Sequence, residues 1–581
     1  MSISHTVTLV LILMAIMIIA IFYYLRKPTS QTSIAIVVLG DIGHSPRMQY
    51  HSLSFASLLN YSVHLIGLSG STCRPEVINN PNIHIHAMKA FPRIKFLPYI
   101  AFAAMKSMYM AIKMFIQLLI IPRPNYILLQ NPPCIPTMFI CVIVSFLRGS
   151  TFAIDWHNLG FTILSLKLPP KEEKKDKGKK GESGLIPPGS EAHILVRLAY
   201  HYERILARTA KINLCVSNGM KKWLKQYFNI EATTVYDKPP DFVGKGAKET
   251  EKRKKNEERM QKKGSSTLTE MGEVLDEQVE NERKANELNR IFKLYHSGFD
   301  GFSFDKPKIA GNKKETEKSS HSSSSSSSSS DFTFSSITQP ADSPTKPFGI
   351  DKTLDDPDVS KGEKASTKIY CPFVERDKDG RLKLKESRPA LLVSPTSWTP
   401  DEDFTPLREA LVKAEEEIRK RHITNFPRVL LCITGKGPLL SYHLSKLHEL
   451  HLSFFSAHPL WLESADYPRF LSCADAGVSM HQSSSGIDLP MKVVDMFGCG
   501  VPAIARQFKC INELVKDNVN GVLFDTSQQL TEHLLDLLND FPHNEKLSQL
   551  SKNVQSGTER WTSCWSRCAK PLFPPINRKK D

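Results

Sequence analysis

The chain of 581 residues is 41% hydrophobic and 9% aromatic, which is enough for two or three cored domains and excludes a wholly disordered protein. Its 11 cysteines are scattered without a CxxC pair, which excludes a dense disulfide scaffold and predicts reduced thiols. Much of the net charge of +16 lies in two lysine-rich tracts, residues 171–180 and 241–263, and no basic segment is interleaved with aromatic residues, so we expect no nucleic-acid partner.

The amino-terminal segment 6–25 contains only apolar, aromatic, alanine and threonine residues. About 20 residues at about 1.5 Å each match a hydrocarbon core of about 30 Å, so residues 1–28 predict a transmembrane signal anchor. A cleaved signal peptide is the alternative, but no small-x-small cleavage site follows. Arg26 and Lys27 come next and predict an outside amino terminus with the remainder in the cytosol. The sequon at Asn60 should then stay unglycosylated.

The region 32–240 has the pattern of a doubly wound parallel sheet, the first Rossmann-like domain. The apolar run 33–39 predicts a buried strand that ends in the turn Gly40-Asp41-Ile42-Gly43. A polar insertion at 169–190 interrupts the region. Further strands are predicted at 62–68, 126–129, 151–155 and 212–216.

The apolar stretch 96–121 contains Lys106 and Lys113, and its pattern leaves two interpretations open. One is a core helix with snorkelling lysines, and the other is a helix that lies on the bilayer. A second spanning helix fits less well, because the two charges would lie inside the membrane.

Residues 241–368 are charge-dense and then serine-rich, with nine consecutive serines at 322–330. Such a composition cannot bury enough apolar area to offset the entropy of ordering. We expect a disordered low-complexity insertion that contains one helix at 269–295.

The region 369–545 predicts a second Rossmann-like domain, with a carboxyl-terminal helix and tail at 546–581. Trp561 and Trp565 are four positions apart and predict one helix face that packs back on the body. Two such domains predict a cleft between them, with ligands at the carboxyl ends of the strands. Its strands are predicted at 390–394, 428–434, 475–480, 502–505 and 521–524, and its helices at 402–420, 491–498 and 528–538.

The segment 483–502 carries the strongest functional signal. A turn at Ser485 and Gly486 enters a helix, so free backbone N–H groups and the positive helix end are offered to a diphosphate. Lys492 adds a full charge there. Asp495 lies about one and a half turns beyond Pro490 at the start of the helix, where a carboxylate can accept hydrogen bonds from ribose hydroxyls; a solvated helix residue is the alternative.

This segment resembles the donor site of GT-B glycosyltransferases, specifically the chitobiosyldiphosphodolichol β-mannosyltransferase family of the endoplasmic reticulum. Two departures stand out: His44 replaces a usual arginine, and the insertion after Pro240 is unusually long. The other motifs that carry the resemblance, in the family's order, are Gly40-Asp41-Ile42-Gly43, Ser45-Pro46-Arg47-Met48, Gln130-Asn131-Pro132-Pro133, Asp155-Trp156-His157-Asn158, Val235-Tyr236-Asp237-Lys238-Pro239, Thr396-Ser397-Trp398-Thr399 and Ile433-Thr434-Gly435-Lys436-Gly437-Pro438.

The resemblance implies a GT-B enzyme that moves mannose from GDP-mannose to GlcNAc2-diphosphodolichol, forming a β-1,4 bond with inversion. His157 and Asp155 are the two candidates for the general base. The alternative for His157 is a non-catalytic histidine that is hydrogen-bonded in the wall of the cleft. Glu513 is expected to stabilise a helix end rather than to act in catalysis. The expected donor-binding residues are Gly435, Lys436, Ser485, Gly486, Lys492 and Asp495, and Gly43 and Arg47 are placed at the cleft.

The expected cofactor inventory is short: GDP-mannose is a substrate, no tightly bound cofactor and no metal site are indicated, and a divalent metal stays open. The expected partners are dolichol-diphosphate-linked chitobiose and the endoplasmic reticulum membrane. We expect the chain to cross this membrane once and its catalytic domains to face the cytosol. Other mannosyltransferases of the same pathway are candidate partners.

Two other function classes stay open. A retaining GT-B transferase would be expected to carry a glutamate pair where this chain has Ile487 and Asp495. A non-catalytic scaffold of lipid-linked oligosaccharide assembly is the second alternative.

Overall fold

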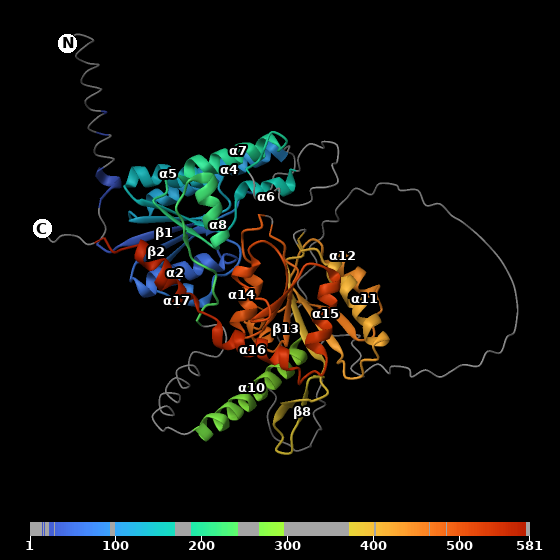
Figure 1. Cartoon of the computed structure of the whole chain (residues 1–581). Coiled ribbons are helices and arrows are strands. Elements are labelled where there is room, and N and C mark those ends of the chain that lie inside the picture. The colour runs from blue at the N-terminus through green and yellow to red at the C-terminus, as the bar shows by residue number, and fades with distance from the viewer. Residues whose placement is uncertain are drawn as a thin grey trace, which may run out of the picture. The chain divides into compact units, whose positions relative to one another are not determined.

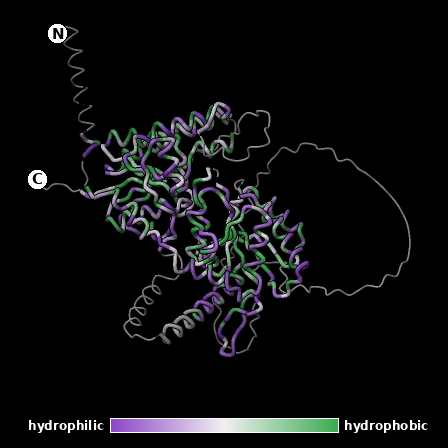
Figure 2. The backbone as a smooth tube through the Cα atoms, in the orientation of Figure 1, coloured by the Kyte–Doolittle hydropathy of each residue, from purple (hydrophilic) through white to green (hydrophobic). Residues whose placement is uncertain are grey.

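The computed structural model contains two parallel β-sheets flanked by helices (Figure 1). Hydrophobic residues concentrate along the strands of both sheets (Figure 2), where the core side chains are buried. The residues that the structure describes are 14, 17, 23–27, 30–92, 99–168, 187–241, 266–295 and 371–576, apart from 400, 401, 464 and 484.

Within the described residues the first sheet has seven strands in the order β3-β2-β1-β4-β5-β6-β7, all paired in parallel. The doubly wound sheet predicted for this half is therefore confirmed. The strands are β1 (Ser33–Asp41), β2 (Ser62–Leu68), β3 (Ile83–Met88), β4 (Tyr126–Asn131), β5 (Thr151–Trp156), β6 (Ile212–Cys215) and β7 (Thr233–Thr234). The helices are α2 (Pro46–Leu58), α3 (Pro75–Ile78), α4 (Tyr99–Ile120), α5 (Thr137–Arg148), α6 (Gly160–Lys167), α7 (Ile194–Ala207) and α8 (Asn218–Trp223).

Within the described residues the second sheet has six parallel strands in the order β12-β11-β10-β13-β14-β15. This half is also doubly wound, as predicted. The strands are β10 (Ala390–Pro395), β11 (Val429–Thr434), β12 (Phe455–Leu460), β13 (Ala476–Ser479), β14 (Ala503–Arg506) and β15 (Gly521–Phe524). The helices are α11 (Thr405–Lys420), α12 (Leu440–His448), α13 (Tyr467–Leu471), α14 (Met491–Gly498), α15 (Ser527–Leu538), α16 (Glu545–Gly557) and α17 (Trp561–Cys568).

Three edge strands of the two sheets were not predicted from the sequence: β3, β12 and the two-residue β7. β3 has the sequence IHIHAM and β12 has FSAHPL, so neither forms the continuous apolar run that marks a buried parallel strand. Both lie at the edge of their sheet, where one side of the strand has no neighbour. Their polar residues are tolerated there, which is why the pattern missed them.

Helix α4 accounts for the part of the apolar stretch 96–121 that the structure describes, and residues 96–98 lie outside that part. One stripe of α4, with Met110, Met114 and Leu118, is buried in the core beneath it. The opposite stripe leaves Met108, Ile112, Ile116 and Ile120 exposed. The helix therefore covers the sheet with one face and presents a second apolar face outward.

Helix α10 (Ser266–Leu294) is the helix expected inside the long insertion, and its second half belongs to the packed fold. Leu288 and Ile291 are buried, and Arg290 pairs with Asp466 at 2.7 Å. A short antiparallel hairpin, β8 (Val374–Arg376) and β9 (Leu382–Leu384), packs beside it. The disorder predicted for 242–265 and 296–368 concerns residues outside the described part.

Helix α17 packs against the first half, as the spacing of Trp561 and Trp565 predicted. Both side chains are buried in a cluster that includes Phe55 of α2 and Tyr61. The end of the chain therefore completes the core on the α2 side of the first sheet.

Among the described residues, no helix is both long enough and apolar enough to cross a membrane. The anchor expected at 6–25 lies mostly outside those residues.

Candidate active site

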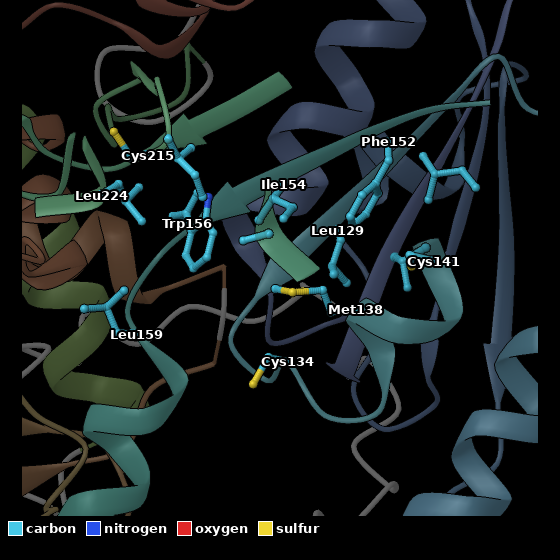
Figure 3. Close-up of a cluster of buried hydrophobic side chains, with 14 of the residues drawn as sticks. Leu129, Cys134, Met138, Cys141, Phe152, Ile154, Trp156, Leu159, Cys215 and Leu224 are labelled. Atoms are coloured by element: carbon cyan, nitrogen blue, oxygen red, sulfur yellow. The ribbon is translucent and has the colours of Figure 1, made fainter. Parts of the chain in front are cut away.

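The carboxyl end of β5 holds the first group of candidate catalytic residues. Ile154 and Trp156 lie in one buried apolar cluster with Leu129 of β4 (Figure 3). Because β5 ends in this core, Asp155 and His157 are held in fixed register. They lie at the edge of the sheet where doubly wound proteins bind their ligands.

Asp155 is fully buried and paired with Arg47 of α2. The guanidinium donates to both carboxylate oxygens, from Nε to Oδ2 at 2.8 Å and from Nη2 to Oδ1 at 2.9 Å. Burial opposes ionisation, but the charges of Arg47 and then His157 hold the pKa of the Asp155 carboxyl well below its usual value. A carboxylate held this firmly in its ionised form is a poor proton acceptor, so the geometry disfavours Asp155 as the base.

Arg47, placed at the cleft by sequence, is a buried cation that joins three elements. Its Nη1 donates to Oδ1 of Asp237 and to the carbonyl oxygen of Val235, both at 2.8 Å. Asp237 follows β7 and is the second carboxylate of the cluster. It belongs to one of the recognised motifs, but its pairing with Arg47 has no local signal in the sequence.

His157 is the partly exposed member of this cluster, with 22% of its side chain accessible. Its Nε2 lies 2.8 Å from Oδ2 of Asp155, and its backbone N–H donates to the carbonyl of Asn131 at 2.8 Å. An ionised carboxylate only accepts, so the ring proton lies on Nε2 and Nδ1 keeps its lone pair. A histidine oriented by a buried carboxylate is the arrangement of Ser-His-Asp enzymes, and it can take a proton from a hydroxyl.

The glycine turn after β1 is closed by Asp41. Its carboxylate accepts hydrogen bonds from the backbone N–H groups of Gly43 at 3.0 Å and Ser71 at 2.8 Å. Burial opposes ionisation, but the hydrogen bond to His44 and those to Ser71 and Gly43 lower the pKa of Asp41 to about 2. A Cβ on Gly43 would lie 2.4 Å from the carbonyl oxygen of Ser71, so glycine is required for these two loops to touch.

The serine turn expected to hold the diphosphate precedes α14. Gly486 has φ of +71°, a conformation that favours glycine, and its N–H donates to Oγ of Ser483 at 2.7 Å. Ser483 in turn donates to the carboxylate of Asp488, and Ser485 is buried. Part of the hydrogen-bonding capacity of the turn therefore serves to close the turn itself.

Lys492 of α14 forms an ion pair with Glu402, a residue that no local pattern singles out. The Glu402 carboxylate is 1% exposed and also accepts from Oγ1 of Thr396 at 2.5 Å and from the N–H of Ser397 at 2.6 Å. Lys492 is 22% exposed. Its amine therefore has one buried protein partner and one side open to a ligand.

Asp495 lies almost one turn beyond Lys492 on α14 and is partly buried. Burial raises the pKa of its carboxyl to about 7, although the charge of Arg74 opposes the shift. Hydrogen-bond donors such as ribose hydroxyls would stabilise the ionised form.

The turn that begins at Gly435 follows β11. Gly435 has φ of +118°, and a Cβ there would lie 1.9 Å from the carbonyl oxygen of Thr396, so glycine is required. Nζ of Lys436 lies 4.0 Å from the ring centroid of the exposed Trp461. This cation–π contact holds Lys436 at the carboxyl ends of β11 and β12.

Segments that follow strands of both sheets meet at the amino end of α8. The hydroxyl of Ser217 donates to the carbonyl oxygen of Ile487. The carboxylate of Glu513 accepts from the N–H groups of Asn218 at 2.7 Å and Gly219 at 2.8 Å. Glu513 therefore stabilises a helix end, as predicted, but the helix is α8 of the other half rather than its own.

Comparison with known proteins identifies the family. The Glycosyl transferases group 1 family matches residues 408–540. The chain is 34% identical over 551 residues to the chitobiosyldiphosphodolichol beta-mannosyltransferase of Homo sapiens, with 94% of each chain covered. The chain belongs to the chitobiosyldiphosphodolichol beta-mannosyltransferase family.

Two further relatives extend this comparison. The Dictyostelium discoideum protein of the same name is 33% identical over 583 residues, with 93% of this chain and 94% of that protein covered. An Arabidopsis thaliana protein named UDP-glycosyltransferase TURAN is 32% identical over 564 residues, with 93% and 97% covered. The crystal structure of Anabaena Alr3699/HepE with UDP-glucose has a TM-score of 0.49 and 10% identity, over 93% of this chain and 99% of that chain.

This chitobiosyldiphosphodolichol beta-mannosyltransferase family member has the GT-B fold that the resemblance implied, with two parallel Rossmann-like sheets. Within the described residues, no group of three or more His, Cys, Asp or Glu side chains is arranged to hold a metal ion. The ionisable groups at the carboxyl ends of the strands are Arg47, Asp155, His157, Asp237, Glu402, Lys436, Lys492 and Asp495.

Proposed function

We propose that this protein transfers mannose from GDP-mannose to GlcNAc2-diphosphodolichol and forms a β-1,4 bond with inversion. The observation that carries the proposal is the pair of His157 and Asp155 at the end of β5, in a chain whose curated relatives are named for that acceptor. The donor comes from the resemblance of the segment 483–502 to the family's donor site.

In the proposed reaction the acceptor hydroxyl oxygen attacks C1 of mannose while the bond from C1 to the GDP phosphate oxygen breaks. The electron pair of that bond leaves with GDP, and the hydroxyl proton passes to Nδ1 of His157. The carboxylate of Asp155, 2.8 Å from Nε2, stabilises the imidazolium that forms. A single displacement turns an α-linked donor into a β-linked product.

On the donor side, the amino end of α14 and its preceding turn would hold the diphosphate. Lys492 would add a positive charge, and its side chain is held in place by the ion pair with Glu402. Lys436 is held in place by its contact with the ring of Trp461. Both lysines would stabilise the negative charge that develops on the leaving GDP. Asp495 would accept hydrogen bonds from the ribose.

An apolar surface on the first half supports a membrane-bound acceptor. The helices α4, α5, α6 and α7 lie on the same side of the first sheet (Figure 1), where α4 contacts α5, α5 contacts α7 and α7 contacts α6. An exposed apolar surface of this kind is typical of a protein or membrane interaction site. Its exposed residues, called here the apolar face, include Met108, Ile120, Phe146, Leu166, Leu198 and Ile205.

The amino-terminal segment joins the fold at the end of this face. Arg26 donates from Nη2 to the carbonyl of Phe146 at 2.8 Å and from Nε to that of Leu147 at 3.1 Å. In our proposal, residues 6–25 cross the endoplasmic reticulum membrane once, and the apolar face rests on its cytosolic surface. The acceptor lipid would then reach His157 without leaving the bilayer.

The proposal is tested with purified full-length protein in detergent, dolichol-linked chitobiose and radiolabelled GDP-mannose. We expect a lipid-linked trisaccharide that β-mannosidase, but not α-mannosidase, shortens. UDP-glucose serves as the second donor arm, because one relative is named a UDP-glycosyltransferase, and an added chelator examines the need for a metal. An α-linked product, or transfer only from the UDP-sugar, would contradict the proposal.

A further inference from the structure

The Asp155 carboxylate has a third neighbour that the proposed reaction does not use. His51 of α2 is fully buried, and its Nε2 lies 3.2 Å from Oδ2 of Asp155. Its other ring nitrogen, Nδ1, accepts a hydrogen bond of 3.0 Å from the indole N–H of Trp565 in α17. A continuous line of contacts therefore runs from α17 through His51 and Asp155 to His157.

Trp565 fixes the protonation state of His51. An indole N–H only donates, so Nδ1 of His51 must be the acceptor and the ring proton must sit on Nε2, which faces Asp155. Burial lowers the pKa of His51, although the charge of Asp155 opposes the shift. His51 is therefore held neutral with its Nε2 proton toward Asp155, in a contact that is electrostatic rather than a well-aligned hydrogen bond.

The state of His51 matters to His157, because both rings act on the same oxygen of Asp155. A doubly protonated His51 would place a second cation beside Arg47 and weaken the attraction between Asp155 and an imidazolium at His157. The other neutral tautomer would direct a lone pair at the carboxylate and repel it. The hydrogen bond from Trp565 prevents both states.

We infer that Trp565 is a positioning residue for the transfer reaction, which acts through His51 and Asp155 on His157. The inference rests on the proposed function, in which His157 accepts the acceptor proton. In this inference helix α17 helps to position the base that accepts the proton of the acceptor hydroxyl, although Trp565 and His51 are 514 positions apart in the chain.

A change in pH dependence at this site would report on the two histidines. Arg47 stays charged between two carboxylates, and burial raises the pKa of the Cys215 thiol to about 12. The groups that face His51 and Asp155 from the surrounding elements are Arg47 of α2, His157 after β5, Cys215 of β6 and Asp237 after β7.

Helix α17 offers a matched control. Trp561, one turn before Trp565, is also buried and donates its indole N–H to Oγ of Ser54 at 2.9 Å. Ser54→Ala removes one buried hydrogen bond between the same two helices and leaves in place the Trp561 ring, which packs edge-on against His51 with 5.1 Å between ring centroids. Trp565→Phe removes the other bond and keeps an aromatic ring against Phe55.

The test measures kcat, KM for GDP-mannose, and the pH profile of kcat/KM for the full-length variants. We expect Trp565→Phe to lower kcat roughly tenfold and to shift the acidic limb of the profile, with KM for the donor unchanged. Ser54→Ala should keep the wild-type kcat and profile at a comparable loss of melting temperature.

A second pair of variants separates hydrogen bonding from packing. In His51→Gln the amide oxygen can accept from Trp565 and the amide N–H₂ can donate to Asp155, and the group does not titrate. It should recover most of the activity that His51→Leu loses. Equal activities of these two variants, or matching profiles for Trp565→Phe and Ser54→Ala, would overturn the inference.

His157→Ala distinguishes this inference from the function on which it rests. If that variant stays active, the proposed role of His157 fails, whatever Trp565 does. If it is inactive while Trp565→Phe behaves like Ser54→Ala, the proposed function survives and only the role of Trp565 is wrong.

Discussion

Lys492 and Glu402, 90 positions apart in the chain, form an ion pair in which the carboxylate is almost completely buried. The pair links helix α14 to the segment that follows β10. In the proposed function Lys492 would serve the diphosphate as well as the fold, so its removal should have two separable effects.

We expect Lys492→Ala to weaken GDP binding by about 1–3 kcal/mol, because a charge-assisted contact to the diphosphate is lost. The same change should destabilise the fold by about 3–5 kcal/mol, because Glu402 is left buried and uncompensated. Isothermal titration with GDP and thermal unfolding measure the two effects.

The double variant Lys492→Ala/Glu402→Gln is the matched control. It should recover most of the lost stability and none of the lost affinity, because the amide carries no buried charge. Wild-type affinity for GDP in this variant would place the diphosphate elsewhere.

His157→Ala should lower kcat by roughly 10²–10⁴-fold and leave the affinity for GDP-mannose near that of the wild type. The side chain is partly exposed, so the fold should stay intact. Steady-state kinetics with saturating acceptor checks this expectation, and a near-normal kcat would exclude His157 as the base.

Asp155→Asn should behave differently, because Asp155 has a structural role. The change removes one of the two carboxylates that balance the buried Arg47. We expect a loss of about 3–5 kcal/mol in the free energy of unfolding together with loss of activity. A stable Asp155→Asn variant would contradict the description of Arg47 as a buried, balanced cation.

Asp495 should make stability depend on pH. Its folded-state pKa of about 7 lies above the unfolded value of about 4, so its favourable contribution is present below pH 4 and is lost as the pH rises through 7. Asp495→Asn should therefore be more stable than the wild type at pH 8, by more than about 1 kcal/mol, and should show no gain near pH 4.

Denaturant unfolding at both pH values measures this difference for the protein without ligand. If Asp495 also binds the ribose, the same variant should bind GDP more weakly. A gain in stability that is equal at both pH values would show that the carboxyl is not perturbed by burial.

The apolar face should bind membranes by itself. A chain that lacks residues 1–25 should still float with liposomes that contain anionic lipid, and Ile120→Glu/Phe146→Glu should reduce the bound fraction severalfold. Val519→Glu is the control, because Val519 is also an exposed apolar residue but lies in the second half. Equal losses for both variants would show that general surface charge, rather than the apolar face, controls binding.

The sequence by itself determined both parallel sheets, because alternating apolar runs and helical patterns are local features of a chain. It also located the turn before α14 and the residues at the end of β5, since glycines and strand ends are marked at their own positions. The edge strands β3 and β12 were not predicted, because a strand with one free edge does not need a continuous apolar run.

The tertiary structure alone decided which partners each buried charged residue has. Arg47 was placed at the cleft by its motif, yet it is buried between Asp155 and Asp237, and this pairing is what disfavours Asp155 as the base. A buried charge pairs with whichever distant segment the fold brings within about 3 Å of it. The local sequence around the charged residue does not indicate which segment that is. The contact of Trp565 with His51 has the same origin, since it exists only because the last helix packs beneath the first sheet.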